Sequence, residues 1–180
     1  MRVLAISGSL RRGSFNTALL EAAAVESASI ADFVGWSGLA DIPAYDEDLD
    51  GIPPAVATLR SKIARSDAIL IATPEYNASV PGALKNALDW ASRPFGDNVL
   101  RNKPAAVIGA SPGMFGAVWA QADLRRILKA IGASVEERDL PVAQAHEAFT
   151  ADGRLRDPKL AAALRSIVSD LVSQAAQRAA

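Results

Sequence analysis

A short segment near the N-terminus, residues 7–16, concentrates groups that can bind a phosphate. It reads Ser-Gly-Ser-Leu-Arg-Arg-Gly-Ser-Phe-Asn, so hydroxyls, guanidinium groups and an amide follow one another closely. Its glycines let the backbone turn and expose N–H groups, and the helix expected to follow directs its positive end to the same point. The segment predicts a site for a phosphate monoester, the alternative being a plain strand-to-helix turn with solvated arginines.

The spacing of the glycines in this segment discriminates between phosphate ligands. The spacing of Gly8 and Gly13, followed by Ser14, is similar to that of a P-loop, but the P-loop lysine is missing. Leu10 stands where a dinucleotide-binding G-x-G-x-x-G motif needs its second glycine. We therefore expect neither nucleotide hydrolysis nor tight dinucleotide binding at this loop, and a dedicated monophosphate matches it better.

Two further loops are expected at the same end of the molecule. Residues 73–82 place Tyr76 between two prolines, which makes a stiff loop with exposed backbone amides. Residues 109–116 contain glycines that allow close approach by a flat ligand. Taken alone, each loop is as typical of a plain connection between a strand and a helix as of a ligand-binding loop. Together with the phosphate segment, they predict an elongated phosphorylated ligand that carries a flat ring.

The composition excludes most other catalytic equipment. The 180 residues include no cysteine and a single histidine, His146, so we expect no disulfide, thiol nucleophile, metal site or histidine triad. The formal net charge of -1 argues against nucleic-acid binding, which needs a concentrated positive field. No signal peptide is recognisable and no apolar stretch approaches the roughly 20 residues of a membrane span, so we expect a cytoplasmic protein without membrane contact. An enzyme of this composition would depend on a cofactor.

Short apolar runs alternate with helical patterns along the chain. The expected strands cover residues 3–7, 29–36, 68–72, 104–110 and 133–136. The expected helices cover residues 15–26, 55–65, 82–92 and 117–131, and a last one starts at residue 157. This alternation predicts a single α/β domain over residues 1–180, a three-layer sandwich with a parallel sheet. Five strands favour the flavodoxin-like order 2-1-3-4-5, in which ligands bind beyond the carboxyl ends of the strands.

Three stretches of the sequence resemble the NADPH-dependent FMN reductase family, particularly its chromate and quinone reductase branch. They are residues 8–16 (GSLRRGSFN), 40–46 (ADIPAYD) and 74–90 (PEYNASVPGALKNALDW). The stretch 74–90 is the most specific of the three. The likeness runs from the first strand to at least Gly132, whereas the last third of the chain matches only in general helical character.

The resemblance implies a bound FMN and names no catalytic side chain and no metal. The residues that it implies at the phosphate segment are Ser9, Arg11, Ser14, Phe15, Asn16 and Thr17. Those implied at the isoalloxazine ring and ribityl chain, mostly through backbone amides, are Pro74, Glu75, Tyr76, Asn77, Ser111 and Gly113. The family also forms homodimers, and often homotetramers, through the helix at residues 81–90. In that helix Lys85 and Asp89 lie one turn apart, where they pair with each other or bond across the interface.

The implied activity is hydride transfer from NADPH or NADH through bound FMN to a small-molecule acceptor, in a ping-pong sequence. Quinones, chromate, azo compounds and free flavin are all candidate acceptors, and the sequence does not choose among them. One alternative is a flavodoxin-type electron carrier that does not itself oxidise NAD(P)H, but such carriers are usually strongly acidic and this chain has a net charge of -1. Another is a phosphate-binding module without redox activity.

Overall fold

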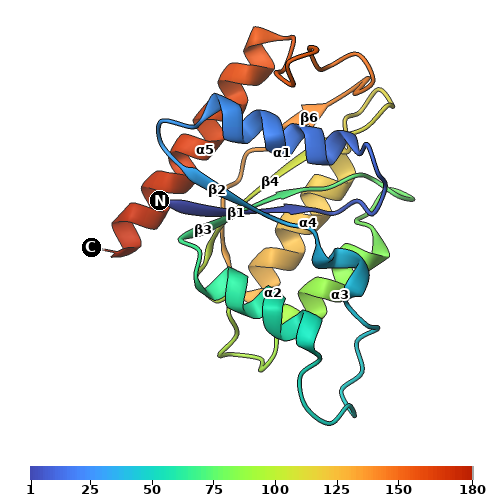
Figure 1. Ribbon diagram of the computed structural model, residues 1–180, viewed down its shortest axis with the longest axis vertical. Coiled ribbons are helices and arrows are strands. Elements are labelled where there is room, and N and C mark those ends of the chain that lie inside the picture. Colours follow the sequence, from blue (N-terminus) through green and yellow to red (C-terminus); the bar gives the residue numbers. More distant parts are fainter. Residues whose placement is uncertain (180) are drawn as a thin grey trace.

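The computed structural model describes residues 1–179, in which a parallel sheet lies between two layers of helices (Figure 1). The strands are β1 Arg2–Ser7, β2 Asp32–Trp36, β3 Ala68–Ala72, β4 Pro104–Ala110, β5 Ser134–Val135 and β6 Pro141–Val142. The helices are α1 Phe15–Glu26, the 3₁₀ helix η1 Gly38–Asp41, α2 Pro54–Ala64, α3 Gly82–Ala91, α4 Val118–Ile131 and α5 Pro158–Ala179. The strand order is β2-β1-β3-β4-β5, with β6 paired to β4.

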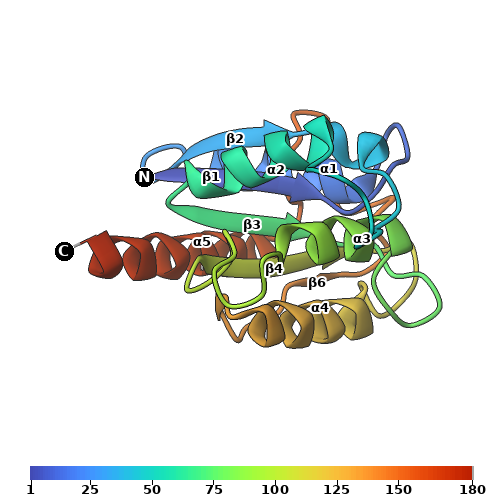
Figure 2. The same ribbon diagram turned by 90° about the horizontal axis from the view of Figure 1, so that it is seen from below.

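Each face of the sheet has its own hydrophobic core. Side chains from β1, β3 and β4 alternate between the two faces, as strand geometry requires, so that Leu70 faces one core and Ile69 the other. Helices α1 and α5 cover the first face, and α2, α3 and α4 cover the second (Figures 1 and 2). Strands β3 and β4 are buried along their whole length, because helices lie on both of their sides.

The order of strands predicted from the sequence is confirmed, and so is the three-layer architecture. The structure adds a sixth strand, β6, where five were expected. The outer position beside β4 is shared: β5 pairs with Pro104 and Ala105 at the start of β4, whereas β6 pairs with Gly109 and Ala110 at its end. A strand of two residues carries no periodic signal, which is why the sequence pattern did not predict β6.

The carboxyl ends of β1, β3 and β4 lie side by side. The N–H of Gly8 donates to the carbonyl of Ala72 at 2.8 Å, and the N–H of Thr73 donates to the carbonyl of Ile108 at 2.9 Å. Packing around Gly8 is tight, because a Cβ at this position would lie 2.9 Å from the Leu84 side chain of α3 and 3.3 Å from Pro74 in the loop after β3. The three loops that follow these strands therefore share one edge of the sheet.

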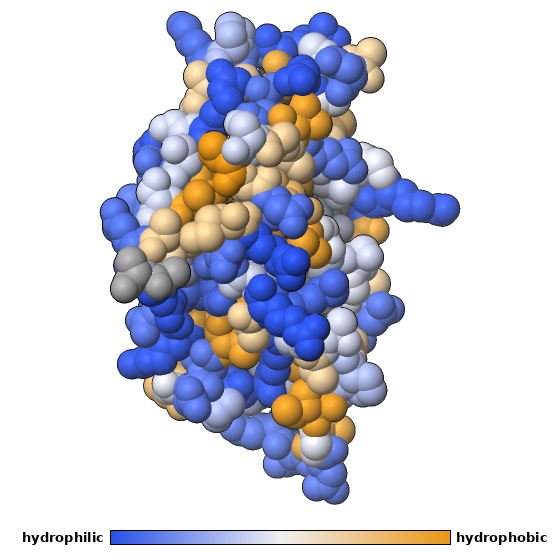
Figure 3. Space-filling view, turned by 60° about the vertical axis from the view of Figure 1, so that its left-hand side comes forward, coloured by the Kyte–Doolittle hydropathy of each residue, from blue (hydrophilic) through white to orange (hydrophobic). Residues whose placement is uncertain are grey.

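On the face of the molecule shown in Figure 3, hydrophobic residues form patches separated by polar and charged ones. Among the helices of residues 1–179, none is long and apolar enough to span a membrane.

Candidate functional site

The loop between β1 and α1 is organised by its own hydroxyl groups. The Oγ atom of Ser14 accepts the N–H of Asn16 at 3.2 Å and thereby caps α1. The Oγ atom of Ser9 accepts the N–H of Arg11 at 3.2 Å. With the turn completed by Gly13 at φ 68°, the backbone N–H groups of residues 12 and 13 have no acceptor among residues 1–179. The loop therefore presents unpaired donors beside the positive end of a helix, which is the arrangement of an anion site.

Two exposed guanidinium groups border this loop. That of Arg11 lies over the ring of Phe15, 5.0 Å from the ring centroid, so Phe15 supports the cation. Within residues 1–179, neither Arg11 nor Arg12 forms an ion pair with a carboxylate. The positive charge at the loop is therefore available to a ligand.

The buried amide of Asn16 joins the first turn of α1 to the end of β4. Its Nδ2 donates to the carbonyl of Ala110 at 2.9 Å, and its Oδ1 accepts the N–H of Ala110, also at 2.9 Å. Both ends of the amide are occupied by protein, and Asn16 is only 2% exposed. This side chain fixes the position of the phosphate loop relative to the loop after β4.

The loop after β3 ends in a tight turn. Tyr76 and Ser79 exchange two backbone hydrogen bonds, of 3.0 and 3.1 Å, and the residues between them, Asn77 and Ala78, have φ angles of 53° and 60°. The N–H groups of Glu75 and Asn77 have no acceptor among residues 1–179. The Tyr76 side chain is exposed. Donors and an aromatic ring thus stand together at this edge, as expected for a loop that borders a flat polar ring.

Two carboxylates tie this turn to α4. The Oε2 atom of Glu75 accepts the N–H groups of Trp119 and Ala120, both at 3.0 Å, where the residue that precedes the helix offers no side-chain cap. The Oδ2 atom of Asp123 accepts the Ser79 hydroxyl at 2.5 Å. That hydroxyl, followed by Arg126, lowers the pKa of Asp123 below its usual 3.8. The Glu75 carboxylate therefore positions the loop, while the N–H of Glu75 has no acceptor among residues 1–179.

The loop after β4 is held by the segment that contains β6. The N–H of Ser111 donates to the carbonyl of Val142 at 3.0 Å, and the carbonyl of Gly113 accepts the N–H of Gln144 at 3.1 Å. The Oγ atom of Ser111 accepts the N–H of Gly113 at 3.1 Å. The following side chains are open to solvent, since Met114 is 80% exposed and Phe115 59%. Apolar surface therefore surrounds this end of the site.

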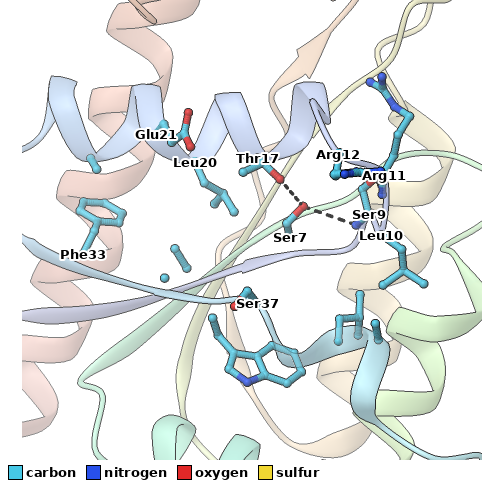
Figure 4. A pocket seen from close by; sticks show the side chains of 16 residues that line it. Ser7, Ser9, Leu10, Arg11, Arg12, Thr17, Leu20, Glu21, Phe33 and Ser37 are labelled. Atoms are coloured by element: carbon cyan, nitrogen blue, oxygen red, sulfur yellow. Dashed lines mark hydrogen bonds between the residues drawn. The ribbon is translucent and has the colours of Figure 1, made fainter.

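The candidate residues named from the sequence thus lie in three loops at one edge of the sheet and in the first turn of α1, and direct contacts join these segments. Sequence reasoning missed Asp123 and the segment from 141 to 145, whose contacts with the loops cross long sequence separations. It also missed a groove beside the phosphate loop, between α1 and β2 (Figure 4). Lys85 and Asp89 pair with each other, 2.7 Å apart, which is one of the two arrangements expected for them.

Comparison with known proteins gives consistent matches. A family model described as NADPH-dependent FMN reductase matches residues 1–147. An NAD(P)H-dependent FMN reductase of Pseudomonas aeruginosa is 45% identical over 167 residues, which cover 88% of this chain and 86% of that protein. A 2-hydroxy-1,4-benzoquinone reductase of a Burkholderia species is 48% identical over 130 residues, which cover 71% of this chain and 69% of that protein. The solved structure of the flavoenzyme NAD(P)H:(acceptor) oxidoreductase of Paracoccus denitrificans matches with a TM-score of 0.86 at 39% identity, covering 98% of this chain and 97% of that one.

Proposed function

This chain belongs to the NADPH-dependent FMN reductase family, and from that premise we propose how its own residues hold FMN and serve an NAD(P)H-dependent reduction. The family resemblance read from the sequence is confirmed, as is the assignment to NAD(P)H-dependent oxidoreductases with FMN as cofactor. The roles of individual residues, the assembly and the acceptor are our proposals.

The phosphate end of the site suits the dianionic monoester of FMN. The observation that carries the proposal is the pair of unpaired N–H groups at residues 12 and 13, next to the N-terminus of α1. We assign the hydroxyls of Ser9, Ser14 and Thr17 to the phosphate oxygens, together with the Arg11 guanidinium that Phe15 supports. We assign Asn16 to holding the phosphate loop in place rather than to contacting the phosphate, because both the nitrogen and the oxygen of its amide bond to Ala110.

The ring end of the site suits a flat ring with a polar edge. The unpaired N–H groups of Glu75 and Asn77 would donate to ring oxygen and nitrogen atoms, and Pro74 and Tyr76 would line one side of the ring. Ser111 and Gly113 would border the ring and the ribityl chain from the loop after β4. A Cβ on Gly113 would have only the Ser111 Oγ within 4 Å, at 3.5 Å, so the backbone is open to close approach.

The chemistry supplied by bound FMN is hydride acceptance from NAD(P)H followed by reduction of an acceptor. The protein residues bind and orient, and we assign none of them to proton transfer. The backbone donors of the loop after β3 would stabilise negative charge at the polar edge of the ring, because they are fixed in place by Glu75 and Ser79 before the ligand arrives.

For the acceptor we propose a quinone. The name of the Burkholderia relative gives a benzoquinone as its substrate. The side chains around the ring end, Tyr76, Met114 and Phe115, are exposed and aromatic or apolar, which favours a flat, weakly polar molecule. Free flavin, chromate and azo compounds are acceptors that the same open face would admit.

We also propose a homodimer or homotetramer assembled through the helix that contains Lys85 and Asp89. The support is the family resemblance together with the position of α3 beside the ring-side loop. We propose the cytoplasm as the compartment, because an NAD(P)H-dependent enzyme needs a regenerated donor pool.

The proposal is tested with purified protein and added FMN. The complex should be yellow, quench flavin fluorescence on binding, and oxidise NADPH or NADH when a benzoquinone is present. The variant Arg11→Ala should weaken FMN binding by about tenfold to a hundredfold, the size of a charge-assisted hydrogen bond.

The matched control is Lys62→Ala, which removes a cation from a second hollow on the opposite face of β2. It should leave FMN affinity unchanged. Protein that cannot be loaded with FMN would sink the proposal. Equal FMN affinity of Arg11→Ala and the wild type would remove Arg11 from the phosphate site while leaving the family assignment intact.

A further inference from the structure

A groove of about 580 Å³ lies between α1 and β2, next to the phosphate loop (Figure 4). Thr17, Leu20 and Glu21 of α1 form one side. Phe33 and Gly35 of β2 lie on the other. Its volume falls within the range of about 300–1,000 Å³ that is typical of small-molecule sites.

The groove exists because the residues beneath it are small. Gly35 pairs in register with Ala5 of the neighbouring strand, and both residues line the groove. A Cβ on Gly35 would meet no heavy atom within 4 Å, so the space above this glycine is empty of protein. Ala24 continues the series of small residues on the α1 side. The small residues of β1, β2 and α1 thus leave a groove between the larger side chains of Leu20 and Phe33.

The two ends of the groove carry opposite charge. Arg11 and Arg12 close one end, and Glu21 lies one helical turn beyond Thr17 toward the other (Figure 4). Arg12 and Glu21 are exposed, and within residues 1–179 neither forms an ion pair or a side-chain hydrogen bond. The groove therefore suits an elongated molecule with an anionic group at one end and hydrogen-bond donors toward the other.

The flavin ring does not belong in this groove. The ring-side loops follow β3 and β4, whereas the groove lies over β1 and β2, and the strand order is β2-β1-β3-β4. The phosphate loop after β1 separates the two regions. A second ligand that reaches from the ring to the groove would cross this loop beside its arginines.

We propose that the groove binds the adenosine 2′-phosphate end of NADPH, with the 2′-phosphate at Arg12 and the adenosine between α1 and Gly35. The proposal rests on the NAD(P)H-dependent reduction proposed above. A purine is flat and weakly polar, like the surface formed by Leu20 and Phe33, and its amino group is a donor suited to the Glu21 carboxylate. Arg12 then favours NADPH over NADH, because NADH lacks the phosphate.

Three variants test the assignment. Gly35→Val fills the groove at a strand position where valine is well tolerated, and it should raise the KM for both NADPH and NADH with kcat and FMN affinity unchanged. Arg12→Ala should raise the KM for NADPH about tenfold and leave the KM for NADH within twofold. Lys62→Ala, on the opposite face of β2, is the control and should change neither.

A binding measurement complements the kinetics. Calorimetric titration of the FMN-loaded protein with 2′,5′-ADP should give saturable binding that Gly35→Val abolishes and Arg12→Ala weakens about tenfold. Titration with 5′-AMP should give weaker binding that is insensitive to Arg12→Ala. A third titration, with inorganic phosphate, measures how much of the 2′,5′-ADP binding comes from the phosphate–arginine contact alone.

The outcomes separate this inference from the proposed function. If the wild type oxidises NADPH but both groove variants keep wild-type KM values and 2′,5′-ADP does not bind, the groove assignment is overturned and the reductase activity stands. If 2′,5′-ADP and 5′-AMP bind equally, the role of Arg12 is overturned. If the FMN-loaded wild type oxidises neither donor, the proposed function fails, and the titration with 2′,5′-ADP decides the groove by itself.

Discussion

The Asn16 amide gives the most direct test of how the site is held. Its two hydrogen bonds to Ala110, each 2.9 Å long, connect the phosphate loop with the loop after β4. Asn16→Ala would leave the N–H and the carbonyl of Ala110 without partners in a region where Ala110 is 2% exposed. An orphaned buried group costs about 1–3 kcal/mol, so we expect a loss of about 3 kcal/mol in the free energy of unfolding.

The measurement is thermal or urea unfolding of the protein prepared without FMN. A loss of this size lowers Tm by roughly 6–12 °C in a domain of this length. The conservative variant Asn16→Asp can still accept the N–H of Ala110, but the introduced carboxyl can donate to the carbonyl only when protonated. Its deficit should therefore shrink as the pH falls below neutrality.

The control variant is Thr17→Val, which removes the exposed hydrogen bond of 3.0 Å to Ser7 and should cost less than about 1 kcal/mol. If Asn16→Ala unfolds at the wild-type temperature without FMN, the hydrogen bonds between Asn16 and Ala110 do not stabilise the fold. If Asn16 only contacted the ligand, its substitution would lower FMN affinity and leave the free energy of unfolding of the FMN-free protein unchanged.

Three other perturbations follow from the same contacts. Glu75→Ala removes the only side-chain acceptor described at the first turn of α4, so unfolding experiments should show a loss of about 1 kcal/mol, and a wild-type urea midpoint would contradict the capping role. Because the pKa of Asp123 is lowered in the fold, its contribution is complete above about pH 4 and is lost as the pH falls through the lowered value; the stability difference between wild type and Asp123→Asn should shrink below pH 4, and a pH-independent difference would refute it. Lys85→Glu should shift the light-scattering mass toward the monomer, whereas an unchanged mass would exclude Lys85 from the interface.

The sequence was informative where the local pattern is strong. The predicted bounds of α1, β3 and β4 agree with the structure, because apolar runs and alanine-rich helical spacing leave little choice there. The second strand begins at Asp32 rather than at residue 29, since residues 27–30 form a turn held by the Ser27 carbonyl. Loops that follow parallel strands meet at one edge in this architecture, so the site could also be located in advance.

The contacts that hold the site could not be predicted in this way. The Asn16 amide meets a partner 94 positions away, and Glu75 caps a helix 44 positions downstream. A pattern within one segment carries no information about such partners. The groove was also missed, because Ala5 and Gly35 become neighbours only once the register of β1 and β2 is known. Small residues in two separate strands look unremarkable until they are paired.

Two short strands, β5 and β6, pair with opposite ends of β4 on its outer side. Only β6 lies at the end of β4 that carries the site. β5 completes the sheet near the start of β4, while β6 and the residues after it hold the loop at 111–116. Contact there is close, because a Cβ on Gly116 would lie 2.5 Å from the carbonyl carbon of Pro141. The connection between the two strands ends at Leu140, which is buried in the hydrophobic core and whose N–H donates to the Gln121 side chain. A change in the length of this connection would therefore disturb the acceptor side of the site and the core together.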